Sequence, residues 1–198
     1  GVAPRGLMDG VLGSNVYEGL MFRNRDEAFT MYGLIADTIK TDPERTFLEV
    51  TIHPDAKFSD GEPIKVDDIL FTIDLFREKG RPPYSRWMQA IESVERIGER
   101  GVRMNLGDGK NRELPLLLGI IPILPKHAID FDTFDQSNLT PILGSGPYVI
   151  SDVNPGTRVV LKKNPDYWAR DLPVRAGFDN FDEIIIDYYR EESSRFEA

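Results

Sequence analysis

Two histidines are the first residues to consider for catalysis or metal binding. His53 lies in a segment of alternating polar and apolar residues, and His127 follows Pro125 much further along the chain. A general base needs an orienting partner and a zinc site needs several ligands, and the sequence offers neither histidine such a local partner. We therefore expect structural or surface histidines and no bound metal.

A nucleophile is equally hard to place. Ser145 lies between Gly144 and Gly146, but the nucleophile elbow G-x-S-x-G also requires glycine at position 143, where the chain has Leu143. The chain has no cysteine, which excludes a cysteine nucleophile, a thiolate metal site and a disulfide scaffold. We expect a tight turn at Ser145 and no catalytic role for its hydroxyl.

The glycines and acidic residues do not form a cofactor or catalytic motif. Gly107 and Gly109 do not extend to G-x-G-x-x-G, because position 112 is Arg112, and no Walker sequence occurs. The adjacent acids Asp67-Asp68 and Asp182-Glu183 point apart on a helix or a strand, which does not suit a hydrolytic pair. We interpret both pairs as surface charge and expect no cofactor.

Composition limits the partners. The chain has 198 residues, 40% of them hydrophobic, which is enough for a packed core in one domain or two small subdomains. Its net charge of -9 repels polyphosphates and anionic lipid, so we expect no nucleic acid partner. The longest apolar run, 114–124, is too short and too interrupted to span a bilayer. Residues 1–10 lack the pattern of a secretory signal, so any signal has been removed.

Apolar spacing predicts three helices. Residues 66–79 place Ile69, Ile73 and Phe76 on one face and end before Gly80, so this is the clearest helix. Residues 7–20 carry a weaker helical pattern that contains two glycines. Residues 191–198 are typical of the first turns of a helix and lack a terminator, so the chain looks cut from a longer protein.

Alternating apolar residues and turn residues predict the strands. We expect a half-buried strand first, then a hairpin, then a pair of strands joined by Asn154-Pro155-Gly156, and last an isoleucine-rich buried strand. The segments concerned are 47–53, 93–97 with 102–106, 148–150 with 157–161, and 183–188.

The segment Arg81–Met88 is the most promising for ligand contact. It follows the clearest helix and combines two prolines and two arginines with Tyr84 and Trp87. A loop of this composition offers rigid apolar surface with a hydroxyl and guanidinium groups, as in the wall of a ligand or peptide site. Packing of Tyr84 and Trp87 into the core is the alternative. Because no residue set requires catalysis, the sequence favours a binding module.

Several segments, taken in order, resemble the extracytoplasmic solute-binding proteins of peptide ABC transporters, family 5, which includes the dipeptide- and oligopeptide-binding proteins. These segments cover nearly the whole chain and are Asn15–Leu20, Phe58–Pro63, Val66–Ile69, Leu124–His127, Gly144–Tyr148 and Asn164–Trp168. Further segments resemble the subgroup associated with oligopeptides and microcin C, namely Tyr32–Ala36, Gly109–Pro115, Arg170–Val174 and Asn180–Ile184. One departure is Lys65, which stands where relatives carry a Thr or Ser helix cap.

The resemblance implies a mixed α/β fold that forms part of lobe one of a two-lobed periplasmic binding protein of type II. By this comparison, residues 1–138 are the peripheral subdomain of lobe one, and residues 139–198 begin the central sheet of that lobe. The second lobe and the C-terminal return into lobe one are expected to lie outside this chain. In the family, the two lobes close over the ligand by a hinge motion.

The resemblance also implies a function: capture of oligopeptides, including microcin C-like modified peptides, in the periplasm and delivery to permease subunits at the inner membrane. An extended peptide in such a cleft is held through its backbone, while wet pockets accept varied side chains. The residues of this chain that we expect to contact ligand are Tyr84, Trp87, Tyr17 and Ser145. Neither catalysis, a cofactor nor direct membrane insertion is expected of such a protein.

Two other functions stay open. A receptor for nickel, haem or a sugar can use the same scaffold, because a fold does not fix its ligand. Tight retention of a metal or a chromophore would favour this alternative. The more remote alternative is a carboxylate-dependent hydrolase, in which substitution of Asp60 or Asp182 would abolish activity without unfolding the chain.

Overall fold

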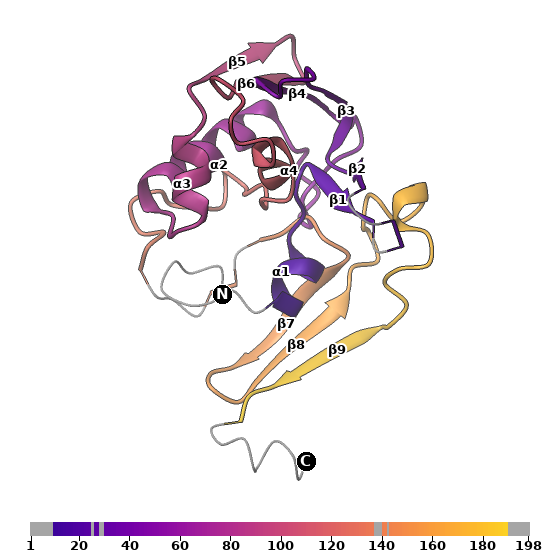
Figure 1. The fold of residues 1–198 in the computed structure, drawn as a ribbon. Helices are drawn as coiled ribbons and strands as arrows, with labels where there is room; N and C mark the ends of the chain where they lie inside the picture. Colours follow the sequence, from indigo (N-terminus) through magenta and orange to yellow (C-terminus); the bar gives the residue numbers. More distant parts are fainter. Residues whose placement is uncertain (1–9, 25, 28–29, 137–139, 142, 190–198) are drawn as a thin grey trace.

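The computed structural model describes residues 10–189, apart from 25, 28–29, 137–139 and 142, and combines helices with three antiparallel sheets. Figure 1 shows a four-stranded sheet at one end of the molecule, a group of helices beneath it and a three-stranded sheet at the other end. This is the mixed α/β fold class predicted from the sequence. The predicted boundary between 138 and 139, and the predicted helix at 191–198, fall outside the described residues.

The four-stranded sheet has the strand order β3-β4-β6-β5, with every neighbouring pair antiparallel. Its strands are β3 (Ala36–Lys40), β4 (Phe47–Ile52), β5 (Ser93–Ile97) and β6 (Gly101–Asn105). Half-buried and buried residues alternate along β4, because successive side chains leave a strand on opposite faces. The predicted strand at 47–53 and the predicted hairpin are confirmed, with bounds that differ by one residue.

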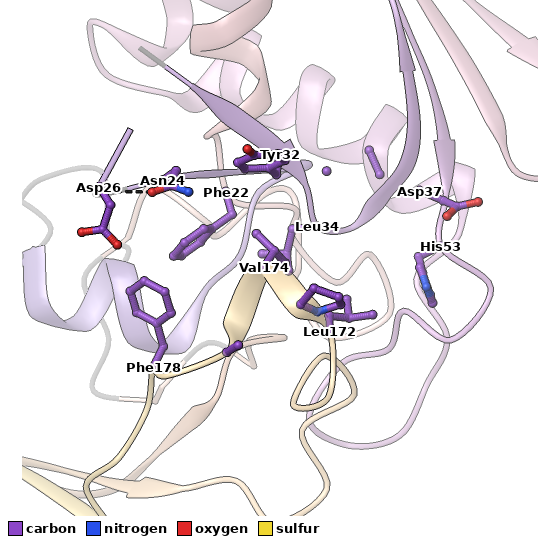
Figure 2. A pocket seen from close by; sticks show the side chains of 14 residues that line it. Phe22, Asn24, Asp26, Tyr32, Leu34, Asp37, His53, Leu172, Val174 and Phe178 are labelled. Atoms are coloured by element: carbon purple, nitrogen blue, oxygen red, sulfur yellow. Dashed lines mark hydrogen bonds between the residues drawn. The ribbon is translucent and has the colours of Figure 1, made fainter. Parts of the chain in front are cut away.

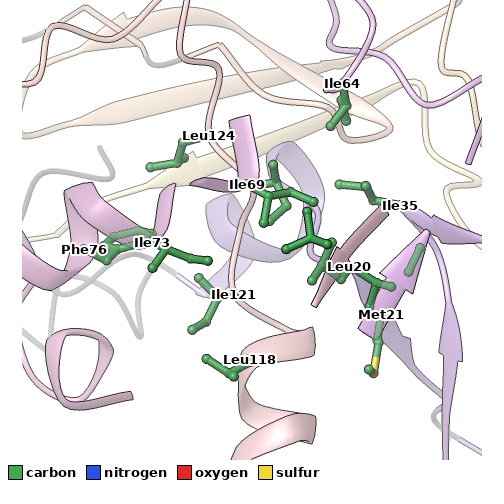
Figure 3. Close-up of a cluster of buried hydrophobic side chains, with 14 of the residues drawn as sticks. Leu20, Met21, Ile35, Ile64, Ile69, Ile73, Phe76, Leu118, Ile121 and Leu124 are labelled. Carbon is green, nitrogen blue, oxygen red and sulfur yellow. The ribbon is translucent and has the colours of Figure 1, made fainter. Parts of the chain in front are cut away.

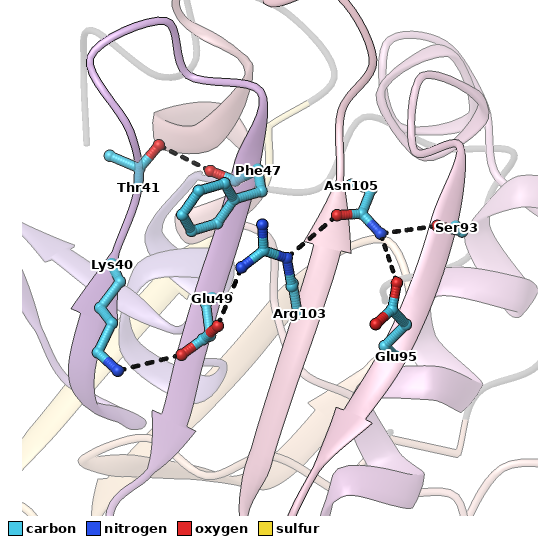
Figure 4. A network of polar contacts seen from close by, with 8 residues as sticks. All are labelled: Lys40, Thr41, Phe47, Glu49, Ser93, Glu95, Arg103 and Asn105. Carbon is cyan, nitrogen blue, oxygen red and sulfur yellow. Dashed lines mark hydrogen bonds and ion pairs between the residues drawn. The ribbon is translucent and has the colours of Figure 1, made fainter.

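A chain of polar contacts crosses one face of this sheet, as Figure 4 shows. Glu49 accepts hydrogen bonds from Lys40 Nζ at 3.2 Å and from Arg103 Nη1 at 3.3 Å. The hydrogen bond from Lys40 is the main cause that lowers the pKa of Glu49 below its ordinary value. Arg103 Nε also donates to Asn105 Oδ1 at 3.2 Å, so the contacts continue from β4 across β6. Polar side chains thus occupy this face.

The other face shares a hydrophobic core with helices α2 (Val66–Lys79), α3 (Tyr84–Gln89) and α4 (Leu114–Gly119). The bounds of α2 are those that its apolar spacing predicts, and it buries Ile69, Ile73 and Phe76. Figure 3 shows these side chains together with residues from other elements, which include Leu20, Ile35, Leu118, Ile121 and Leu124. The expectation of a loop at Arg81–Met88 is wrong in part, because Tyr84–Gln89 is helical.

Asp68 is buried, so the interpretation of its carboxylate as surface charge is wrong. The residue is 5% exposed, and the carboxylate accepts the backbone N–H of Lys65 at 2.8 Å and that of Lys126 at 2.9 Å. Lys65 precedes α2 and has no side-chain acceptor to cap it, so Asp68 satisfies the donor at this helix end from within the first turn. One turn later, Thr72 Oγ1 accepts the N–H of Leu124 at 2.9 Å. Two side chains of α2 therefore fix the backbone of the segment 124–126.

The three-stranded sheet has the order β7-β8-β9, with β7 (Tyr148–Asn154), β8 (Arg158–Lys163) and β9 (Glu183–Asp187). Ile150 pairs with Leu161, as the predicted strand pair requires. The strand at 183–188 is confirmed over 183–187, but the prediction that it is buried is wrong. Its residues alternate between exposed and half-buried, and Ile185 is 51% exposed. Only one side of β9 packs against the core, since Ile184 and Ile186 contact it.

Helix α1 (Gly10–Val16) is shorter than the predicted helix at 7–20. Residues 7–9 lie outside the described residues, and 17–20 are not helical. The chain leaves the helix because its backbone next pairs with the segment after α4, where the Ile123 N–H donates to the Glu18 carbonyl at 2.9 Å. A Cβ on Gly19 would lie 2.6 Å from the Gly119 carbonyl oxygen, so only glycine allows this approach.

Candidate functional site

Two pockets lie beside the small sheet formed by β1 (Met21–Arg23) and β2 (Met31–Gly33), and both are lined by Phe22 and Leu34. The first, which we call the tyrosine pocket, has a volume of about 290 Å³ and includes Tyr17 and Tyr84 in its lining. The second, which we call the large pocket, has a volume of about 510 Å³. The large pocket is of a size typical of small-molecule sites.

The tyrosine pocket brings together two of the four residues predicted to contact ligand. Tyr17 directly follows α1, whereas Tyr84 is the first residue of α3. Burial raises the pKa of Tyr17 above its ordinary value, so its hydroxyl stays protonated at physiological pH. The half-buried Tyr84 ring stacks on Phe76 of α2 with ring centroids 5.3 Å apart. Tyr84 therefore packs against the core and also lines a pocket, so both readings of this residue stay open.

The other two predicted residues do not line either pocket. Trp87 is half-buried on α3, where its ring meets that of Tyr84 edge-on at 5.6 Å and packs against the core. Ser145 is buried, and its Oγ has no hydrogen-bond partner in the part of the chain that the structure describes. The structure thus places Tyr17 and Tyr84 together and Trp87 and Ser145 elsewhere. A ligand contact by any of the four stays a prediction.

The two glycines beside Ser145 have a role beyond the predicted tight turn. The Gly146 N–H donates to the Val16 carbonyl at the end of α1, at 2.9 Å. A Cβ on Gly144 would lie 2.0 Å from the same Val16 oxygen, and one on Gly146 would lie 2.5 Å from the Asn15 oxygen. The chain bends at Gly146-Pro147, and the two glycines also allow a close crossing of two backbones, which only glycine permits.

Glu18, which sequence reasoning did not single out, lies buried in the wall of the tyrosine pocket. Its carboxylate accepts a hydrogen bond from the Tyr167 hydroxyl and another, of 3.2 Å, from Trp168 Nε1. Burial raises the pKa of Glu18 to about 7, against the opposing effects of these hydrogen bonds and of the Arg175 charge. A usable signal existed, since Glu18 and the two aromatic residues belong to two of the segments that carry the family resemblance.

Arg175 supplies positive charge beside the same carboxylate. The residue is 5% exposed, and its Nη2 donates to Asp179 at 2.5 Å. Its guanidinium carbon lies 4.8 Å from the centroid of the Phe22 ring and 5.6 Å from that of Tyr167. Among the described residues, Arg175 Nε has no hydrogen-bond partner. No sequence motif marks this arginine, because it ends the short turn η1 (Pro173–Arg175) in an otherwise irregular segment.

His127 has a partner that its sequence neighbours do not reveal. Its Nε2 lies 2.8 Å from Asp60 Oδ2, and its ring meets Phe58 at 5.6 Å. Partial burial acts to raise the pKa of Asp60. Hydrogen bonds from His127 and the Glu62 backbone outweigh burial and lower this pKa below its ordinary value. His53 instead packs against Trp168 at 5.4 Å. Within the described residues, no group of three or more acidic or histidine side chains is placed to hold a metal ion.

These pockets offer hydroxyls, aromatic faces and the buried polar groups of Glu18 and Arg175, which are means of binding a ligand. The fold also matches that of solved proteins. A mannohexaose-bound periplasmic oligopeptide-binding protein from Thermotoga maritima aligns with a TM-score of 0.79 and 22% identity, over 99% of this chain and 36% of that one. The oligopeptide-binding protein AppA from Bacillus subtilis, in complex with a nonapeptide, aligns with a TM-score of 0.77 and 22% identity, over 97% of this chain and 38% of that one.

The chain belongs to the bacterial extracellular solute-binding proteins, family 5, whose family model matches residues 30–198. It is 48% identical over 195 residues to the peptidoglycan-binding protein YepA of Agrobacterium fabrum, and this match covers 98% of the chain. The match spans 32% of that relative, so this chain corresponds to about a third of its length. The predicted family and the predicted fold class are both confirmed. None of the described helices has the length and apolar character needed to cross a membrane.

Proposed function

We propose that the protein containing this chain is the substrate-binding component of an ABC importer that captures peptides in the periplasm and delivers them to permease subunits at the inner membrane. Membership of family 5 across residues 30–198 carries this proposal. Support for a peptide ligand comes from the nonapeptide complex of a protein with the same fold. On this view the chain binds and releases ligand and performs no chemical reaction on it.

In this proposal the chain supplies part of one lobe. Residues 1–138 form its peripheral subdomain, and residues 139–198 begin its central sheet. The tyrosine pocket is the part of this lobe that contacts the ligand, because Tyr17 and Tyr84 offer hydroxyls to a peptide backbone and Tyr84 also offers a ring face. Trp87 and Ser145 are secondary candidates. The buried Glu18 carboxylate, which accepts hydrogen bonds from Tyr167 and Trp168, holds the pocket wall in place behind them.

The ligand class that we propose is an oligopeptide, either unmodified or carrying a substituent as in microcin C. The similarity to the peptidoglycan-binding protein YepA supports peptidoglycan-derived peptides as members of this class. A sugar is the second candidate, and the mannohexaose complex of a structural neighbour favours it. Nickel and haem are further alternatives on the same scaffold.

Native mass spectrometry of the full-length protein, before and after denaturation, tests the proposal. Peptides that copurify with the protein and are released on denaturation support it, and their masses distinguish plain from modified peptides. Calorimetric titration with a nonapeptide, a muramyl tripeptide, mannohexaose and nickel then ranks the classes. Binding of mannohexaose or nickel alone would overturn the peptide proposal, and hydrolysis of an added peptide by the pure protein would overturn a role limited to binding.

A further inference from the structure

Of the described residues, the large pocket shares only Phe22 and Leu34 with the tyrosine pocket, and its polar lining residues are different. Its walls come from β1, β2, the start of β3, His53 and the segment 172–178. Figure 2 shows that Asp26 and Asn24 lie at one end of this lining, and that Asp37 and His53 lie at the other. Apolar side chains occupy the space between the two ends. A carboxylate thus lies at each end of this lining.

The middle of the large pocket is apolar and aromatic. Phe22 and Phe178 meet edge-to-face with ring centroids 5.2 Å apart, and Leu34, Val174 and Tyr32 complete this part of the lining. The Arg175 guanidinium stands 4.8 Å from the Phe22 ring and is itself paired with Asp179. The middle of the pocket therefore suits hydrocarbon, which gains by leaving water.

The two ends carry negative charge that nothing in the described chain balances. Asp26 and Asp37 are exposed at the rim, and neither carboxylate has a hydrogen-bond or ion-pair partner among the described residues. Among the lining residues that the structure describes, none is a lysine or an arginine. The nearby Glu27 accepts the Tyr32 hydroxyl at 2.8 Å and adds a further acidic side chain. A ligand with positive charge at both ends would compensate this arrangement.

We propose that the large pocket binds a linear aliphatic diamine or polyamine. One ammonium group pairs with the carboxylate of Asp26 and the other with that of Asp37, while the methylene chain lies across Phe22, Leu34 and Val174. A neutral sugar could contact the aromatic rings but would leave both carboxylates without a counter-charge. The inference does not rest on the peptide proposal: Phe22 and Leu34 line both pockets, but Asp26, Asp37 and Val174 line only the large pocket.

Calorimetric titration of the full-length protein with spermidine, putrescine and n-butylamine tests the proposal. Butylamine carries one ammonium group, so it is expected to bind more weakly than putrescine. Asp26→Asn and Asp37→Asn are each expected to weaken spermidine binding about fivefold, the upper range for an exposed ion pair. Glu99→Gln is the matched control, because Glu99 is an exposed acid on the turn between β5 and β6 and lines neither pocket.

Three results would overturn the polyamine site. These are the absence of spermidine binding, equal affinity for butylamine and putrescine, and equal weakening by Glu99→Gln and the two pocket variants, which would indicate attraction to the overall charge of -9. A titration of the peptide-loaded protein separates the two proposals. Retained spermidine binding supports two sites, and competition between peptide and spermidine would overturn the separate site.

Discussion

Trp168 Nε1 donates a hydrogen bond of 3.2 Å to Glu18 Oε2, although the two residues are 150 positions apart in the sequence. Tyr167 donates to the other oxygen of the same carboxylate. The turn at Asn164 makes this possible, because its Oδ1 accepts the Asp166 N–H at 3.0 Å and directs the two aromatic residues back toward the end of α1. One carboxylate in the wall of the tyrosine pocket therefore joins the segment after α1 to the segment 164–168.

The Glu18 carboxyl makes stability depend on pH. Burial raises its pKa from an ordinary value of 4.5 to about 7, so the folded state binds the proton more tightly than the unfolded state. This contribution to stability is fully present below pH 4.5 and is lost as pH rises through 7, by on the order of 3 kcal/mol. Urea titrations of the full-length protein at pH 5 and pH 8 measure the difference.

Glu18→Gln provides the comparison. The amide oxygen can accept from Trp168 and the amide nitrogen can donate to the Tyr167 hydroxyl, so the variant keeps both hydrogen bonds without a titrating group. We expect this variant to show no loss of stability between pH 5 and pH 8. At pH 8 its free energy of unfolding should equal or exceed that of the native protein. The exposed Glu99→Gln should leave the pH dependence as it is. An unchanged pH profile in Glu18→Gln would contradict the assignment.

Asp68 and Asp67 are neighbours on α2, but we expect their substitution by alanine to lower the free energy of unfolding by very different amounts. Asp68→Ala leaves the N–H groups of Lys65 and Lys126 without their acceptor in a buried site, which should cost about 2–4 kcal/mol of unfolding free energy. Asp67 is exposed and pairs with Arg96, so Asp67→Ala should cost less than about 1 kcal/mol. Hydrogen exchange at the Lys126 amide should accelerate only in Asp68→Ala. Equal losses in the two variants would show that helix charge, and not the buried acceptor, sets the effect.

What the sequence predicts well is local. The bounds of α2 follow from its apolar spacing, and the pairing of β5 with β6 follows from the turn between them. The burial of β9 could not be predicted in the same way, because it depends on which distant element covers each side of the strand. The same limit applies to Asp68, whose second hydrogen-bond partner is Lys126, 58 positions further along the chain.

The candidate site shows the same division. Tyr84 could be selected as a ligand contact because its segment combines prolines, arginines and aromatic residues. Tyr17 could be selected from the family resemblance, and both residues line one pocket. Arg175 could not be selected, because its position beside Phe22 and Tyr167 results from tertiary contacts around an irregular turn. The large pocket was not foreseen either, since its lining combines three strands with His53 and the segment 172–178.

Gly144 marks a backbone crossing that a single methyl group should break. In Gly144→Ala the new Cβ would lie 2.0 Å from the Val16 carbonyl oxygen, so α1 and the segment before β7 must separate. We expect a loss of at least about 3 kcal/mol of unfolding free energy. Gly156→Ala is the control, because its Cβ meets nothing within 4 Å and only the positive φ of 75° is unfavourable. That variant should lose about 1 kcal/mol, and a similar loss in both would rule out the crossing as the cause.

Tyr17 and Tyr84 should contribute to peptide affinity through their hydroxyls. Removing one neutral hydrogen bond by Tyr17→Phe or Tyr84→Phe is expected to raise the dissociation constant for a nonapeptide about two- to tenfold. Tyr84→Ala should have a larger effect, because it also removes the ring that stacks on Phe76 and lines the pocket. Tyr32→Phe is the matched control, since Tyr32 lines only the large pocket. Calorimetric titration measures the dissociation constants, and it uses full-length variants whose thermal unfolding matches that of the native protein. Unchanged affinity in both Tyr17→Phe and Tyr84→Phe, with the Tyr32 variant also unchanged, would place the peptide outside the tyrosine pocket.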